Sequence, residues 1–222
     1  MKTNLSISLV TISLLFLTAC GDSNQNQSEL SSDEEKEKSE SAQDCHFEYK
    51  AGSAELAWTA FKTSEKLPVG GKFTELEISG GSHSNGVSDL LKTIEFSALT
   101  NSTSTRDTTR DRKIVNFFFM KMNGTDAITG KVISADGDND SGTCTFMLKM
   151  NDVEKEVPLN YTVLNDTLRL TGGIDVLDFD ASTALSALNE ACKLLHTGKD
   201  GVSKTWSTVD LSIMAALSKD CH

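Results

Sequence analysis

Four cysteines and two histidines have the spacing that most directly suggests chemistry in this chain of 222 residues. The dipeptide Cys45-His46 recurs near the other end as Cys221-His222, and Cys144 and Cys192 lie between them. An even number of thiols in an oxidising compartment favours disulfides. Three pairings of these four cysteines are possible from the sequence; we favour the one in which Cys45–Cys221 joins the two ends of a domain and Cys144–Cys192 forms a second bridge. The two Cys-His dipeptides could instead make a Cys2His2 zinc site, but adjacent Cys and His side chains rarely reach one metal ion, so we predict no metal.

The fifth cysteine, Cys20, follows a segment typical of an exported protein. Lys2 gives a short positive start, and residues 5–17 form an apolar run too short to span a bilayer comfortably. The sequence Leu17-Thr18-Ala19-Cys20 resembles the bacterial lipoprotein lipobox, in which the cysteine is acylated and becomes the new N-terminus. We therefore expect residues 1–19 to be a signal peptide and Cys20 to carry a lipid anchor, since two acyl chains hold a protein stably at a membrane.

Residues 20–44 are expected to be a disordered acidic tether behind the lipidated cysteine. From residue 21 to residue 43 there is one leucine and no aromatic or β-branched residue, so the segment cannot bury enough apolar surface to offset its ordering entropy. Gly21 stands where the inner-membrane retention signal of some bacteria has aspartate. We expect a lipid-anchored protein of the bacterial cell envelope, on the periplasmic side and preferably at the outer membrane.

Composition and motifs argue against several function classes. A net charge of −11 without a basic stripe argues against a nucleic-acid partner. No GxSxG, HExxH or glycine-rich phosphate loop is present, so we expect a protein that is not an enzyme and has no cofactor. Asp136, Asp138 and Asp140 have the spacing of a calcium loop, but Ser141 and Met147 stand where that loop needs glycine and glutamate.

Short segments of alternating apolar and polar residues predict an antiparallel β domain over residues 45–222. The clearest is a hairpin in which residues 144–150 and 157–163 alternate on either side of Asn151-Asp152. One late helix is expected over residues 182–195, where apolar residues recur at helical spacing. About eight strands would close into a barrel that can hold one small ligand. The other expected strands are residues 55–60, 73–79, 94–98, 117–122, 128–134, 168–170 and 209–215.

The segment from Arg106 to Met120 combines charged residues with three consecutive phenylalanines. We expect Arg110-Asp111 to fix a polar turn that leads into a strand. Because successive side chains of a strand face opposite sides, Phe118 would then point into the barrel, while Phe117 and Phe119 would point away. Arg106 or Arg110 at the barrel mouth could also contact a ligand head group.

Four motifs, in this order and approximate spacing, resemble the YceI-like family. They are Trp58-Thr59-Ala60-Phe61-Lys62, Gly71-Lys72-Phe73, Ile94-Glu95-Phe96-Ser97, and Arg110-Asp111-Arg112-Lys113-Ile114 before Phe117-Phe118. Two motifs of the family are absent: a His-Ser pair near Ser53-Ala54, and a late Asn-Arg-x-x-Phe-Gly segment, which residues 174–179 and the following helix replace. The resemblance spans the domain from Cys45 to the C-terminus.

The resemblance implies a mainly β fold: a lipocalin-like antiparallel β-barrel of about eight strands, here with one late α-helix. It also implies an apolar interior that binds a long isoprenoid or fatty tail, and no reaction. Phenyl rings can line such a tunnel without a polar partner. The alternative is a structural or partner-interaction module with a closed, dry barrel. The candidate ligand-binding residues are Trp58, Phe61, Phe73, Phe96, Phe118, Phe146 and Arg110.

Overall fold

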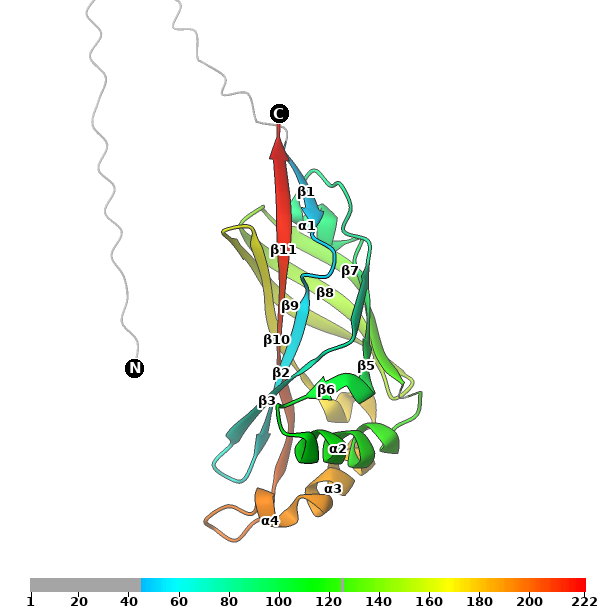
Figure 1. Ribbon diagram of the computed structural model, residues 1–222, viewed down its shortest axis with the longest axis vertical. Helices are drawn as coiled ribbons and strands as arrows, with labels where there is room; N and C mark the ends of the chain where they lie inside the picture. The colour runs from blue at the N-terminus through cyan, green and yellow to red at the C-terminus, as the bar shows by residue number, and fades with distance from the viewer. Residues whose placement is uncertain (1–44, 125) are drawn as a thin grey trace, which may run out of the picture. The chain divides into compact units, whose positions relative to one another are not determined.

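The computed structural model of the chain describes residues 45–124 and 126–222 (Figure 1). The expected signal peptide, the lipidated Cys20 and the acidic tether lie outside these residues. Within the described part of the chain, no helix is both long enough and apolar enough to cross a membrane.

Strands make up most of the domain, and short helices connect some of them. The strands are β1 (Cys45–Tyr49), β2 (Glu55–Lys62), β3 (Leu67–Phe73), β4 (Leu76–Ser79), β5 (Glu95–Leu99), β6 (Thr103–Ser104), β7 (Ala127–Gly137), β8 (Ser141–Met150), β9 (Val153–Leu164), β10 (Thr167–Asp175) and β11 (Thr205–Cys221). The α-helices are α1 (Val87–Leu91), α2 (Thr108–Phe117), α3 (Ser182–Ala191) and α4 (Lys193–His196), and the 3₁₀ helices are η1 (Thr100–Ser102), η2 (Phe119–Lys121) and η3 (Val176–Phe179).

All strands pair antiparallel in one curled, half-barrel sheet of the order β4-β5-β7-β8-β9-β10-β11-β2-β3-β6, and β1 pairs with β11. Ten strands therefore follow one another, not about eight. The number is higher because Thr74 and Glu75 separate β3 from β4, and η1 separates β5 from β6. The two ends of the path, β4 and β6, thus belong to chain segments that adjoin β3 and β5, and the sheet curls back toward itself.

The expected strand at residues 117–122 is wrong, because the Arg-Asp segment forms a helix instead. The Asp107 carboxylate caps α2 by accepting hydrogen bonds from the backbone N–H groups of Thr109 (3.0 Å) and Arg110 (3.1 Å). The Asp111 carboxylate fixes the preceding chain by accepting from the Thr105 N–H (2.7 Å) and hydroxyl (2.6 Å). Helix α2 places the phenylalanines at its C-terminal end, where η2 follows.

The expected late helix is present and divides into two. Helix α3 ends at Ala191 and α4 begins at Lys193, with Cys192 between them. Helices α2, α3 and α4 gather at one end of the curled sheet, and α1 lies at the other end (Figure 1). At the α1 end the interior is packed, with Val87, Leu90 and Leu91 of α1 completely or almost completely buried.

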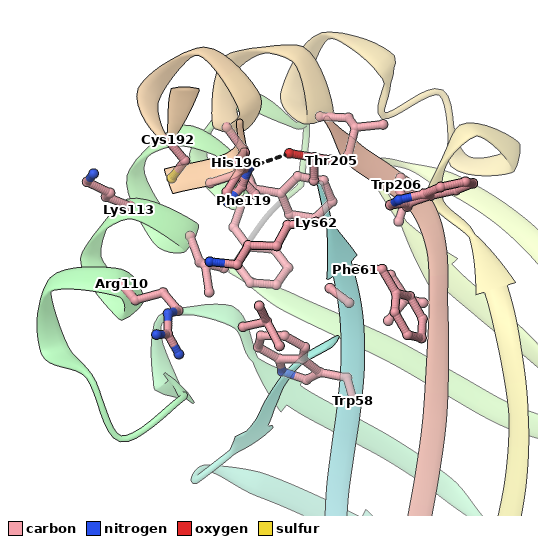
Figure 2. Close-up of a pocket in the computed structure, with 18 of the residues that line it drawn as sticks. Trp58, Phe61, Lys62, Arg110, Lys113, Phe119, Cys192, His196, Thr205 and Trp206 are labelled. Atoms are coloured by element: carbon pink, nitrogen blue, oxygen red, sulfur yellow. Dashed lines mark hydrogen bonds between the residues drawn. The ribbon is translucent and has the colours of Figure 1, made fainter. Parts of the chain in front are cut away.

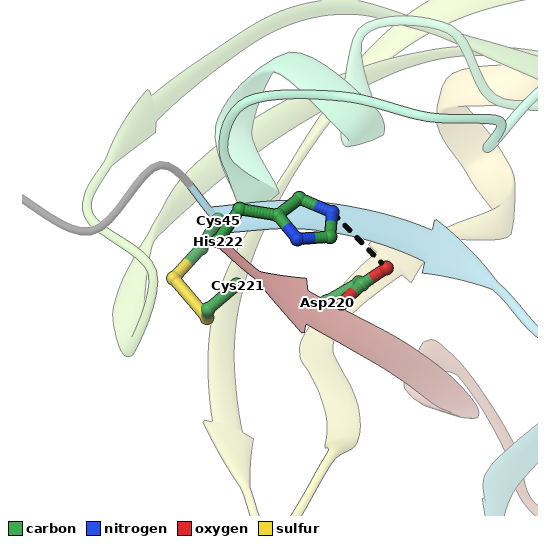
Figure 3. Close-up of a disulfide and its surroundings, with 4 residues drawn as sticks. All are labelled: Cys45, Asp220, Cys221 and His222. Carbon is green, nitrogen blue, oxygen red and sulfur yellow. Dashed lines mark ion pairs between the residues drawn. A yellow bond between two sulfur atoms is a disulfide. The ribbon is translucent and has the colours of Figure 1, made fainter.

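Only one of the two expected disulfides forms. Cys45 and Cys221 are opposite each other in the β1–β11 register and are bonded (Figure 3). Because both sulfurs are used in this bond, they are not available as thiolate ligands for the alternative zinc site. Cys144 and Cys192 are free, buried thiols. The predicted bridge between them is wrong because the two thiols lie at opposite ends of the sheet. Cys144 lies beside Tyr161, whose hydroxyl donates to the Asp138 carbonyl in the β7–β8 turn next to α1, whereas Cys192 follows α3 among the helices at the other end.

Candidate functional site

A cavity of about 310 Å³ opens inside the helical end of the sheet, between β2, β3 and β11 on one side and α2, α3 and α4 on the other. This volume is at the lower end of the range of roughly 300–1,000 Å³ found for small-molecule sites. Most of its lining is apolar. The apolar lining residues are Trp58, Ala60, Phe61, Val69, Phe73, Ile114, Phe118, Phe119, Ile128, Met150, Val176, Leu185, Leu188, Leu195, Trp206, Val209 and Leu211.

The indole of Trp58 forms part of the floor of this cavity because its cross-strand partner is a glycine. Trp58 and Gly71 are opposite each other in the β2–β3 register. A Cβ atom at Gly71 would lie 2.3 Å from Trp58 Cζ2, a distance that real side chains do not tolerate. The glycine therefore lets the indole lie across β3. The Trp58 Nε1–H is buried and has no acceptor among the described residues.

Phe118 and Phe119 both border the cavity, contrary to the alternation expected for a strand. Their rings meet edge to face, with centroids 5.3 Å apart. This arrangement arises because the chain turns from α2 into η2 at these residues instead of running extended. Phe117 is 38% exposed and takes no part in the lining.

Polar side chains meet at the helical end of the cavity (Figure 2). Lys62 reaches into it from β2, on the opposite side of the strand from Phe61. Arg110 and Lys113 approach from α2. The Lys113 ammonium donates to the Ala191 carbonyl at the end of α3 (3.2 Å), where the helix dipole favours a cation.

A chain of hydrogen bonds fixes the protonation of His196. Asn189 Nδ2 donates to the Ser203 carbonyl (3.5 Å), so Asn189 Oδ1 is free to accept from the Thr205 hydroxyl (2.9 Å). That hydroxyl has no second proton, so His196 Nδ1, 2.6 Å away, must be the donor to it. His196 therefore carries a proton on Nδ1. Because burial, followed by the charges of Lys62 and Lys113, lowers its pKa to about 4, the ring is the neutral Nδ1–H tautomer at neutral pH. Its Nε2 is a bare acceptor with no hydrogen bond within the described residues.

Known proteins match this chain in structure and not in sequence. No protein-family model matches the sequence, and no curated protein does. A polyisoprenoid-binding domain from Saccharophagus degradans superposes with a TM-score of 0.54 at 13% identity, over 79% of this chain and 99% of that one. BcnA from Burkholderia cenocepacia gives a TM-score of 0.55 at 10% identity, over 77% and 99%. A YCEI protein from Campylobacter jejuni gives 0.47 at 19% identity, over 68% and 85%. The chain has the YceI-like fold.

Within this YceI-like fold, most of the predicted site residues come together. The lining of the cavity includes Trp58, Phe61, Phe73, Phe118 and Arg110. Phe61 lies at its border, where the Lys66 ammonium is 4.7 Å from the ring centroid. Arg110 is already neutralised in part, because its guanidinium is 3.7 Å from the Asp107 carboxylate.

Phe96 and Phe146 are not part of the cavity. Their rings meet edge to face with centroids 5.9 Å apart, and both belong to the packed interior nearer α1. Phe96 also covers Gly130 of β7, where an added Cβ would meet Phe96 Cε1 at 2.4 Å. Strand alternation places both rings inside the sheet, but it does not distinguish a packed end from an open one.

Several lining residues were missed by sequence reasoning. Lys62 was overlooked although it follows Trp58 and Ala60 at two-residue intervals and so shares their inward face. Ile114 and Phe118 have the (i, i+4) spacing that brings them onto one face of a helix, and this signal could have identified α2 as part of the site. Leu185 and Leu188 were recognised as an apolar helix face, but not as cavity lining.

The stability of the domain should depend on pH through His196. Burial, followed by the charges of Lys62 and Lys113, lowers the pKa of His196 from 6.5 to about 4. The unfolded chain binds a proton near pH 6.5 that the folded chain does not bind until about pH 4, so stability is lost as pH falls through this window. We expect His196→Asn, which retains a donor to Thr205, to reduce the loss between pH 7 and pH 4 by about 1–3 kcal/mol.

Chemical denaturation at several pH values would measure this difference, because carboxylates that also titrate contribute equally to both proteins. Parallel stability curves for the parent and His196→Asn would contradict the neutral, buried state of this histidine.

Proposed function

We propose that the protein binds the apolar tail of an isoprenoid-like or fatty molecule in the cavity at the helical end, without catalysis. The observation that carries this proposal is the open volume of about 310 Å³ inside the sheet, which is lined mainly by aromatic and aliphatic side chains. A cavity of this lining excludes hydrophilic ligands, because their polar groups would lose water without gaining partners. The apolar groups of a lipid tail instead gain free energy on leaving water.

The shared fold supports this assignment. The structure from Saccharophagus degradans is described as a polyisoprenoid-binding domain. Almost all of that structure (99%) superposes on 79% of this chain. The alternative, a structural module with a closed, dry barrel, requires a filled interior. The interior around Phe96 and Phe146 is filled, but the helical end contains the cavity.

We further propose that the domain is held at the periplasmic side of a bacterial membrane, preferably the outer membrane, through a lipid on Cys20 and the tether at residues 20–44. The sequence Leu17-Thr18-Ala19-Cys20 supports this location. In a bacterial host, labelled palmitate should be incorporated into the protein and not into a Cys20→Ala variant. Equal labelling of the two proteins would contradict the anchor.

Binding can be followed by intrinsic fluorescence, because both tryptophans of the chain, Trp58 and Trp206, border the cavity. Titration of the delipidated, purified full chain with farnesol should change the tryptophan emission and saturate at one ligand per chain. An emission that stays constant with farnesol, palmitate and tetradecanol would favour the dry alternative.

A further inference from the structure

Building on the proposed function, we propose that Lys62, with Lys113 and His196, forms a head-group site for an acidic amphiphile, and that His196 takes up a proton when this ligand binds. The ligand would place its tail among the aromatic side chains and its anionic group between β2 and α2.

The first observation is the charge of Lys62. Its side chain is half-buried on the inward face of β2, beyond Trp58 and Ala60. No salt bridge to Lys62 occurs within the described residues, although six other ion pairs do. An ammonium group directed into an apolar cavity is costly without an opposite charge. A ligand anion would supply that charge.

The second observation is how little negative charge the cavity itself provides. Among the lining residues of the described chain, Asp107 is the only carboxylate, and it already caps α2 and pairs with Arg110. Lys113 donates to the neutral carbonyl of Ala191, and it shares the charge of Asp107 with Arg110 without forming an ion pair of its own. One carboxylate therefore faces three cations, and the excess positive charge lies toward Lys62 and Lys113, not at Arg110, which the sequence predicted.

The third observation is His196, whose ring is held by Thr205 with the bare Nε2 unpaired. The groups near it are Lys62 from β2, Lys113 and Arg110 from α2, the buried Cys192 thiol and the Thr205 hydroxyl of β11. Burial, followed by the two lysine charges, opposes its protonation in the empty protein. An anion bound beside the lysines offsets their charges and can accept a hydrogen bond from a protonated Nε2, so binding and proton uptake are linked.

Two sources carry the required chemistry: a fatty carboxylate and a prenyl phosphate. Both combine an apolar tail with an anionic head, and the cavity volume accommodates only part of a long tail. Palmitate and farnesyl phosphate, compared with each other, would distinguish the two sources once the charge preference is established.

The test of charge preference uses two probes that share one tail, tetradecanesulfonate and tetradecanol, with the purified full chain. The sulfonate keeps its charge at all pH values used. We expect it to bind at least about tenfold more tightly than the alcohol, and Lys62→Met to remove this preference. Lys155→Met is the matched control, because Lys155 is exposed on β9 and lies outside the cavity lining, and it should keep the preference.

Proton uptake is measured by calorimetry of tetradecanesulfonate binding near pH 5.5 in two buffers of different ionisation enthalpy. The parent should take up a substantial fraction of one proton and His196→Asn none. Equal affinities for sulfonate and alcohol would overturn the head-group site, and sulfonate binding without uptake would overturn the role of His196. In both of these cases tail binding persists. If neither probe binds, the proposed lipid binding itself fails, and this inference fails with it.

Discussion

The substitution Ala60→Trp should lower the affinity of the protein for farnesol by about a hundredfold, which corresponds to ~2.7 kcal/mol of binding free energy. Ala60 lies on the inward face of β2, directly opposite Val69 of β3 and Val209 of β11, and all three line the cavity. An indole at this position would occupy the space that the tail is proposed to fill. Overpacking a filled core typically costs about 1–3 kcal/mol. An indole added to an open space should cost less than this, so we expect the variant to fold.

The matched control is Ala57→Trp, on the same strand but on its other face, because side chains three residues apart in a strand point to opposite sides. Equilibrium partitioning of radiolabelled farnesol measures both variants without interference from the added tryptophan. We expect Ala57→Trp to bind like the parent. If Ala60→Trp also bound like the parent, the ligand would have to occupy a different place.

Loss of the Cys45–Cys221 disulfide should destabilise the domain by about 2–5 kcal/mol. The bond closes a loop with a sequence separation of 176 residues, for which the chain-entropy relation gives about 5 kcal/mol. It also holds β1, whose Phe47 is 3% exposed, against β11. Since domains of this kind are stable by only about 5–15 kcal/mol, such a loss is a large part of the total.

Urea denaturation of the parent with and without reductant, compared with a Cys45→Ala/Cys221→Ala variant, measures this contribution. The parent should lose stability on reduction, while the variant should be unaffected by reductant. Two thiols, Cys144 and Cys192, should react with a thiol reagent only on unfolding, because both are buried. A reduced parent as stable as the oxidised one would contradict a structural role for the bond.

The alternation of apolar and polar residues predicted the strands well where one face of the strand is buried and the other is exposed to solvent. The hairpin of β8 and β9 follows the alternation on both sides of Asn151-Asp152, which adopt the left-handed conformation of a tight turn. The segment after Asp107 was misassigned because its three phenylalanines were interpreted as strand alternation. The side-chain cap at Asp107 and the (i, i+4) pair Ile114 and Phe118 determine a helix there instead.

The sequence predicts that the site is lined by aromatic side chains, but it predicts only part of its position in the sheet. An aromatic residue on the inward face of a strand is identifiable from sequence, as Trp58 and Phe73 show. Which end of the sheet stays open depends on how α1 and the three other helices close it, and this is a tertiary property. Phe146 was therefore placed in a cavity that lies at the other end. The pairing of Cys144 with Cys192 failed for the same reason.

The most direct measurement of lipid binding is native mass spectrometry of the purified full chain with farnesol, alongside Ala60→Trp and Ala57→Trp. We predict one farnesol bound to each parent chain and to each Ala57→Trp chain, and none to Ala60→Trp at the same concentration. A parent protein that stays empty, or three proteins that bind equally, would contradict the assignment of the cavity as the lipid site.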